Sequence, residues 1–191
     1  MQRLLKLRSL ILLVVVAGGL GVGLYYATRP QPQPRPEPRP FVWGFDMMDL
    51  VHLEIELPRA GMKERWKRGE DRQWYFDDEQ GQPVNRDRWG GGVALLVSGP
   101  GANRLIAEEA TDEQMELFGL TEPQMTLGLT LIDGRLVEVI VGDATPDGRS
   151  YYIKEITDVD VYTVDYTWYG VLARLVTDPP YAPPDQKPIE S

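Results

Sequence analysis

The chain has 191 residues, a net charge of −9 and no cysteine. This length suits one ordinary domain together with terminal segments. The lack of cysteine excludes disulfides, thiolate zinc sites, iron–sulfur ligation and cysteine nucleophiles. Residues 1–40 carry a net charge of +5, so the remainder, from Phe41 onward, carries −14. A surface this negative repels phosphate backbones, so nucleic acid is not expected as a partner.

The strongest signal along the chain is an uncharged apolar segment between Arg8 and Arg29. Its twenty residues, 9–28, would span about 30 Å as a helix, which matches the hydrocarbon thickness of a bilayer. Basic residues precede it, so residues 1–8 are predicted to stay cytoplasmic and the rest of the chain to be extracytoplasmic. We therefore expect a single-pass protein of a bacterial inner or plasma membrane, or an equivalent membrane.

A cleaved signal peptide is the alternative, because a basic start followed by an apolar segment is common to both. No small-x-small cleavage site precedes Arg29, which favours a retained anchor. Gly19 and Gly23 have the small-xxx-small spacing that allows close helix contact. They predict self-association of the helix or packing on a partner helix, although such glycines are also found without this role.

Two proline-rich segments flank the expected domain. Residues 29–40 include the string PQPQPRPEPRP, in which every second residue is proline. Proline fixes φ and disfavours helix in the residue before it, so this segment is predicted to be an extended stalk reaching about 3 Å per residue. Residues 178–191 are predicted to be a disordered tail. The domain should therefore occupy residues 41–177.

The first half of the domain begins with strand signals. Residues 51–57 alternate apolar and polar side chains, which predicts a half-buried strand with Val51, Leu53, Ile55 and Leu57 facing inward. Residues 62–68 and 73–76 predict two further strands. Residues 85–97 predict a helix capped by Asn85, with Trp89, Val93 and Leu96 on one face, although Gly90, Gly91 and Gly92 weaken it.

The second half adds hairpins and a closing helix. A strand at 104–108 and a short helix from Thr111 to near Gly119 come first. Strands at 127–131 and 137–141 can share one apolar face only across an odd-numbered loop, so the loop should be Ile132-Asp133-Gly134 with Gly134 left-handed. Strands at 151–156 and 161–164 follow. Asp165 should then cap a helix, whose buried stripe is formed by Trp168, Leu172 and Leu175.

These elements predict an α+β fold, in which antiparallel hairpins and meanders carry two or three short helices on one face. The string LFGLTEPQMTLGLTLIDGRLVEVIVGDATPDGRSYYI, residues 117–153, resembles the membrane-attached proteins grouped as domain of unknown function 4340. The resembling motifs are Phe118-Gly119-Leu120, Asp133-Gly134, Val141-Gly142-Asp143, Thr145-Pro146 and Tyr151-Tyr152. The likeness extends over most of residues 50–176. The resemblance implies a fold, and it implies an association with ABC-type export or Gld-type gliding-motility components, without assigned catalytic residues.

Candidate chemistry is sparse. His52 is the only histidine and should point outward beside two glutamates, as a solvated strand residue. Four aspartates lie in predicted loops: Asp143, Asp147, Asp158 and Asp160. Their carboxylate oxygens could bind calcium, but stabilisation of turns is the simpler interpretation. No cofactor is expected. The chain is not expected to be an enzyme, because no nucleophile, acid–base pair or metal set is recognisable.

Three aromatic residues directly follow the stalk: Phe41, Trp43 and Phe45. They could pack on the domain as a lead-in strand or form an apolar surface for a membrane partner. Together with Gly19 and Gly23, they are the candidate interaction residues. The expected function is a non-catalytic accessory or scaffold subunit of an integral-membrane complex, with an envelope polymer- or cation-binding module as the alternative.

Overall fold

The computed structural model describes residues 41–89 and 92–184. The predicted cytoplasmic segment, membrane helix and stalk, with Gly19 and Gly23, lie outside these residues. Within the described ranges, no helix is both long enough and apolar enough to cross a bilayer. Among them, the chain forms an antiparallel β-sheet with a few short helices, which confirms the α+β class.

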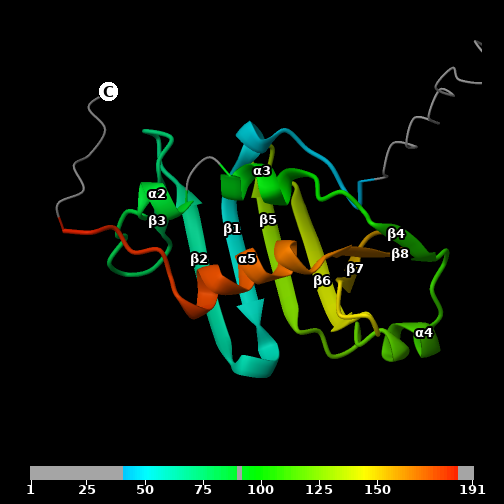
Figure 1. Ribbon diagram of the computed structural model, residues 1–191. Coiled ribbons are helices and arrows are strands. Elements are labelled where there is room, and N and C mark those ends of the chain that lie inside the picture. The colour runs from blue at the N-terminus through cyan, green and yellow to red at the C-terminus, as the bar shows by residue number, and fades with distance from the viewer. Residues whose placement is uncertain (1–40, 90–91, 185–191) are drawn as a thin grey trace, which may run out of the picture. The chain divides into compact units, whose positions relative to one another are not determined.

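The sheet of the described residues has eight strands in the order β3-β2-β1-β5-β6-β7-β8-β4, and every neighbouring pair is antiparallel. Two meanders, β1 to β3 and β5 to β8, join through β1 and β5, and β4 lies at the far edge (Figure 1). The strands are β1 (Leu50–Leu57), β2 (Met62–Arg68), β3 (Trp74–Phe76), β4 (Arg104–Ala107), β5 (Met125–Leu131), β6 (Leu136–Ala144), β7 (Ser150–Glu155) and β8 (Val161–Asp165).

The helical elements are short, and their starts follow from local capping. Asn85 accepts N–H groups at the start of α2, Thr111 and Gln114 form a capping box, and the Asp165 carboxylate accepts the Thr167 N–H. The elements are the 3-10 helices η1 (Met47–Asp49) and η2 (Pro58–Ala60), and the α-helices α2 (Arg86–Trp89), α3 (Gly92–Ser98), α4 (Asp112–Leu117) and α5 (Tyr166–Thr177).

One face of the sheet carries the main core. Strands β1, β5 and β6 alternate, so that Leu53, Leu129 and Val139 are buried on this face. Helix α5 crosses these strands (Figure 1), and the predicted stripe Trp168, Leu172 and Leu175 is buried beneath it. The Trp168 indole N–H donates to the carbonyl of Leu96, at 3.0 Å, which joins α5 to α3.

The opposite face carries a smaller apolar cluster at the β6–β8 end. Phe118, which follows α4, stacks on Tyr152 of β7 with ring centroids 4.5 Å apart. Ile140 and Val161 belong to the same cluster. Because Ile140 alternates with the core residues Val139 and Val141, α4 packs against the face opposite to α5. The prediction that the helices share one face is therefore wrong for α4.

The β5–β6 hairpin has the predicted loop. Leu131 and Arg135 close it through a backbone hydrogen bond of 2.9 Å, and Gly134 has φ +84°. The three loop residues are thus Ile132-Asp133-Gly134, as the alternation required. The loop length follows from whether the number of loop residues is odd or even, since a two-residue loop would place the Leu and Val side chains on opposite faces.

One prediction for β1 needs correction. In β1 the register shifts between Leu50 and His52, so Leu50 is fully buried and Val51 is only partly buried. The β-bulge reverses which of the first residues of the strand face the core. The helix predicted for residues 85–97 corresponds to α2 and α3 among the described residues, and residues 90–91 between them lie outside those residues.

The disordered tail predicted from Asp178 is also wrong for its first residues. Tyr181 stacks on Phe76 with ring centroids 4.4 Å apart, and it bridges to Val84. The Arg88 guanidinium lies 2.8 Å from the Asp178 carboxylate. The folded domain therefore continues to about Ala182, whose N–H donates to the Pro83 carbonyl.

Candidate functional site

The three aromatic residues after the predicted stalk have different environments. Trp43 is buried, its indole N–H donates to the Val97 carbonyl at 2.8 Å, and its ring meets Trp168 edge to face. Phe45 is partly buried against the core. Phe41 is 65% exposed. Of the three, only Phe41 exposes most of its surface.

Further apolar side chains are exposed on the elements beside Phe41. Phe41 bridges Gly101, just beyond α3, and η1 contacts α3. The Asp49 carbonyl, at the end of η1, accepts the N–H of Ile132 in the β5–β6 loop. We call the exposed apolar residues on these elements the apolar rim: Phe41, Met47, Met48, Leu95 and Ile132. Sequence reasoning missed Leu95 and Ile132, because only folding brings α3 and this loop beside η1.

His52 takes part in an ion-pair cluster on the polar face of the sheet. Its Nε2 lies 3.1 Å from an Asp77 carboxylate oxygen, and the Lys67 ammonium lies 2.8 Å from the other oxygen. The hydrogen bond from Lys67 is the main cause that lowers the pKa of Asp77. The predicted outward direction is correct, but the imidazole is only 28% exposed. Its hydrogen-bond partner is the Asp77 carboxylate, so the contact joins β1 to the residue that follows β3.

The four loop aspartates do not converge on one point. Asp143 accepts hydrogen bonds from Arg59 and Gln124, and Asp147 and Asp158 stabilise their own turns. Asp160 accepts the N–H of Glu109. Among residues 41–89 and 92–184, no three acidic or histidine side chains are placed to hold a metal ion. The contacts of Asp147 and Asp158 match the turn-stabilising interpretation, whereas Asp143 and Asp160 join segments that are distant in the sequence.

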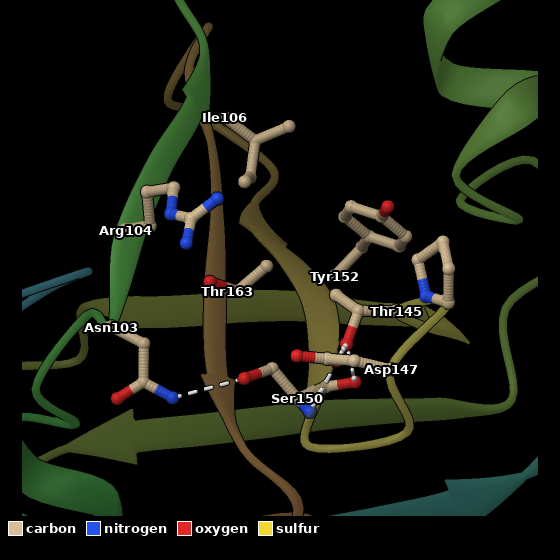
Figure 2. Close-up of a pocket in the computed structure, with 9 residues that line it drawn as sticks. Asn103, Arg104, Ile106, Thr145, Asp147, Ser150, Tyr152 and Thr163 are labelled. Carbon is tan, nitrogen blue, oxygen red and sulfur yellow. Dashed lines mark hydrogen bonds between the residues drawn. The ribbon is translucent and has the colours of Figure 1, made fainter.

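A hollow of about 290 Å³ lies at the β4 edge, on the face that also carries Tyr152 (Figure 2). Its floor is a cross-strand row, because Arg104 of β4 and Tyr152 of β7 both pair with Thr163 of β8. Asn103 and the β6–β7 loop form the walls, and the loop contributes Thr145, Pro146, Asp147 and Ser150. Sequence reasoning missed this hollow, since its residues come from three separate stretches of the chain.

The polar groups of the hollow are only partly satisfied. The Asn103 amide donates to the Ser150 hydroxyl at 3.1 Å, and the Thr145 hydroxyl donates to Asp147 at 2.6 Å. That second bond is the main cause that lowers the pKa of Asp147. Most of Thr163 is buried, but its hydroxyl is accessible from the hollow, and within the described part of the chain it has no hydrogen-bond partner. The Arg104 guanidinium likewise has no acidic partner among those residues.

The segment after α4 crosses the end of β6 at very close range. Gly119 has φ +69°, and a Cβ on Gly142 would lie 2.1 Å from the Phe118 carbonyl oxygen. The Asp143 N–H donates to that same oxygen at 2.8 Å. Only a glycine at 142 lets the two backbones approach so closely. We call this contact the glycine crossing.

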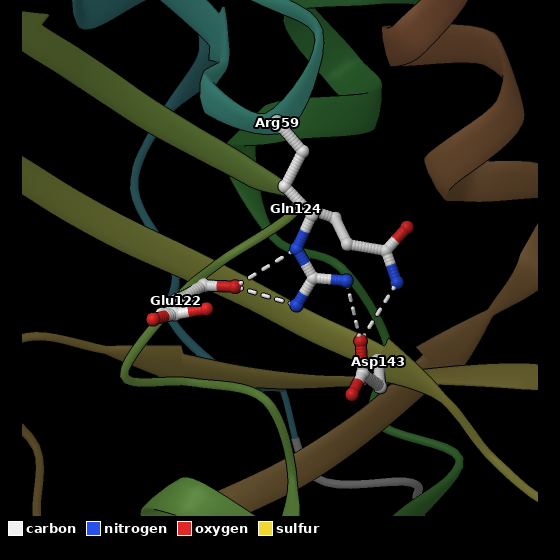
Figure 3. A network of polar contacts seen from close by, with 4 residues as sticks. All are labelled: Arg59, Glu122, Gln124 and Asp143. Carbon is white, nitrogen blue, oxygen red and sulfur yellow. Dashed lines mark hydrogen bonds and ion pairs between the residues drawn. The ribbon is translucent and has the colours of Figure 1, made fainter.

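A polar network holds the glycine crossing to the β1–β2 turn (Figure 3). Arg59 of η2 donates to the Glu122 carbonyl at 2.6 Å and to the Asp143 carboxylate at 2.8 Å. The Gln124 amide donates to the same carboxylate oxygen at 3.1 Å. Arg59 and Asp143 are each nearly half exposed, so this network positions loops and contributes little stability.

The two segments that meet at the glycine crossing lie within the part of the chain that matches a known family. The family described as "Domain of unknown function (DUF4340)" matches residues 74–174, just over half of the chain. The chain belongs to the DUF4340 family. No curated protein and no solved structure matches it. The match runs from β3 to α5, and β1 and β2 lie outside it.

The DUF4340 motifs have packing roles in this fold. Tyr151 stacks on Tyr169 of α5 with centroids 4.0 Å apart, whereas Tyr152 stacks on Phe118 on the other face. Adjacent strand residues point to opposite faces, so this pair attaches one helical element to each side of the sheet. The DUF4340 sequence pattern therefore identifies how the domain is packed.

Proposed function

We propose that this DUF4340 protein is a non-catalytic accessory or scaffold subunit that presents its acidic domain to an integral-membrane protein complex. Residues 9–28 would anchor it, residues 29–40 would hold the domain away from the bilayer, and the domain would be extracytoplasmic. An ABC-type transport complex is the partner class that we favour.

The apolar rim carries this proposal. Exposed large apolar side chains that gather on neighbouring elements are typical of protein interaction sites. Met48 is 48% exposed and Leu95 is 62% exposed, and both lie on elements in contact near the N-terminal start of the described chain. The predicted stalk, residues 29–40, directly precedes Phe41 in the sequence, so the rim includes the residue next to the stalk.

The cation-binding alternative has less support. The carboxylates that could bind a cation accept hydrogen bonds within separate turns, from Arg59, or from the N–H of Glu109. We therefore place docking on a membrane complex first.

Co-purification of the full chain tests the docking role. In a mild detergent, the wild-type protein should retain an integral-membrane partner, and the double variant Phe41→Ser with Met48→Ser should lose it. Leu117→Ser is the matched control, because Leu117 is 74% exposed on α4 and is not part of the rim. A wild-type protein that purifies as a monomer without partners would contradict the proposal.

Two further experiments test the anchor. The chain should stay in the membrane pellet after alkaline extraction, and a protease added outside the cytoplasm should digest the domain. Release into the supernatant would instead support a cleaved signal peptide. Replacing Gly19 and Gly23 by isoleucine should leave the pellet fraction unchanged and should weaken any self-association of the membrane helix.

A further inference from the structure

The hollow at the β4 edge is lined by two hydrogen-bond donors that can serve the same ligand group, the Arg104 guanidinium and the Thr163 hydroxyl. Arg104 and Thr163 are direct cross-strand neighbours, and Figure 2 shows both lining the same concave surface. The Thr163 hydroxyl has no hydrogen-bond partner within the described residues, and it is accessible from the hollow, so it can donate to a ligand acceptor there. The planar fork of a guanidinium pairs with both oxygens of a carboxylate. One end of the hollow is therefore suited to a carboxylate.

The loop wall of the hollow carries the opposite charge. One oxygen of Asp147 accepts bonds from Thr145 and from the N–H of Arg149, whereas the second oxygen has no hydrogen bond within the described residues. The hydrogen bond from Thr145 lowers the pKa of this carboxyl below its ordinary value of 3.8, and an aspartate is already ionised at neutral pH at that ordinary value. A free, ionised carboxylate oxygen at the edge of a hollow is a partner for an ammonium group.

The size of the hollow limits the occupant. About 290 Å³ is at the lower end of small-molecule pockets, which excludes a large buried ligand. Two strand spacings separate β4 from β7, or roughly 10 Å, and Asp147 lies in the loop that leads into β7. The two termini of an extended dipeptide are roughly 7 Å apart. A single amino acid would bring its charges too close together to reach both walls.

We propose that this hollow binds a small zwitterionic ligand of dipeptide size, with its carboxylate on Arg104 and Thr163 and its ammonium group on Asp147. Polyanions are disfavoured, because the residues from Phe41 onward carry a charge of −14. The side chains of Tyr152, Ile106 and Pro146 line the space between the charges and would contact the apolar part of the ligand. This site is separate from the docking role proposed above and does not depend on it.

Isothermal titration of the full chain in detergent micelles tests the proposal, with alanyl-alanine as the probe. We expect saturable binding with a Kd of about 1 mM or tighter. The N-acetylated dipeptide lacks the ammonium group and the dipeptide amide lacks the carboxylate, so each should bind at least about tenfold more weakly. Inorganic phosphate should bind more weakly than alanyl-alanine.

Variants assign the binding to the hollow. Arg104→Gln and Thr163→Val should each weaken binding by about tenfold, and Asp147→Asn should remove the difference between the dipeptide and its N-acetylated form. Thr163→Val should keep the melting temperature of the wild type, because it removes a hydroxyl that has no partner. Arg174→Gln is the matched control, since Arg174 is an exposed arginine on α5 outside the hollow.

Four outcomes would overturn the proposal. The first is no binding heat at about 10 mM dipeptide, and the second is that Arg104→Gln binds the dipeptide as tightly as the wild type does. The third is that the wild type binds the N-acetylated form as tightly as the dipeptide. The fourth is that the wild type binds phosphate more tightly than the dipeptide. None of them bears on co-purification with a membrane partner, so failure here and failure of the docking role are distinguishable.

Discussion

Gly142 and Phe118 meet so closely that any side chain at position 142 would collide with backbone. A Cβ there would lie 2.1 Å from the Phe118 carbonyl oxygen, and that oxygen already accepts the N–H of Asp143. Because the obstacle is backbone, no change of rotamer relieves the collision. The family motifs Phe118-Gly119-Leu120 and Val141-Gly142-Asp143 thus describe two sides of one contact.

Replacing Gly142 by alanine should therefore destabilise the domain by about 3 kcal/mol or more, since the segment after α4 and the end of β6 must separate. The free energy of unfolding measured by urea denaturation checks this. Gly128→Ala is the control, because its Cβ would lie 3.6 Å from the nearest atom, the Cβ of Glu54, at ordinary contact distance. It should stay within about 0.5 kcal/mol of the wild type. Equal stability of the two variants would contradict the close approach.

Trp43 should be essential for folding although it lies next to an exposed phenylalanine. Trp43→Ala removes a buried ring and its hydrogen bond to Val97, and should cost about 3–5 kcal/mol. Phe41→Ala should change stability by less than about 0.5 kcal/mol, because most of that ring is exposed. Thermal melting of both variants measures the difference. Equal melting temperatures would mean that the lead-in segment does not pack on the core.

The C-terminal segment should contribute to stability only as far as its contacts extend. A chain ending at Thr177 loses the stacking of Tyr181 on Phe76 and should be less stable by about 1–3 kcal/mol. A chain ending at Pro184 keeps these contacts and should melt like the full chain. If both truncated chains melt together, residues 178–184 do not pack as described.

The Asp77 cluster should give the domain an acid-sensitive component of stability. The folded-state pKa of Asp77 lies below its ordinary value of 3.8, chiefly through the hydrogen bond from Lys67. Its stabilisation is therefore fully present above pH 3.8 and is lost as the pH falls toward the folded pKa. Asp77→Asn should lower the free energy of unfolding at neutral pH by roughly 1 kcal/mol, and by less at pH 3.

Urea denaturation at several pH values measures this dependence. Glu70→Gln is the control, because Glu70 is exposed and has no ion pair within the described chain, and it should keep the pH dependence of the wild type. A parallel shift of the Asp77→Asn curve at every pH would show that the carboxylate charge does not matter.

Local sequence signals predicted the individual elements well. Apolar alternation identified β1, β5 and β6, side-chain oxygens at Asn85, Thr111 and Asp165 marked the helix starts, and strand parity specified the loop at Gly134. Each of these depends on residues only a few positions apart, so the physical cause lies within the segment itself. The family motifs were recognisable for the same reason, since each is a short turn or strand end.

Only the tertiary structure decided which segments that are distant in the sequence lie beside each other. The bulge that buries Leu50 in place of Val51 depends on pairing with β5, and the packing of Tyr181 depends on β3. The hollow exists because β8 places Thr163 between Arg104 and Tyr152. Such relationships come from long-range strand pairing and side-chain packing, which no local pattern encodes. The sequence thus determined the elements and the charge of this protein, and its folding determined which residues meet at a surface or a site.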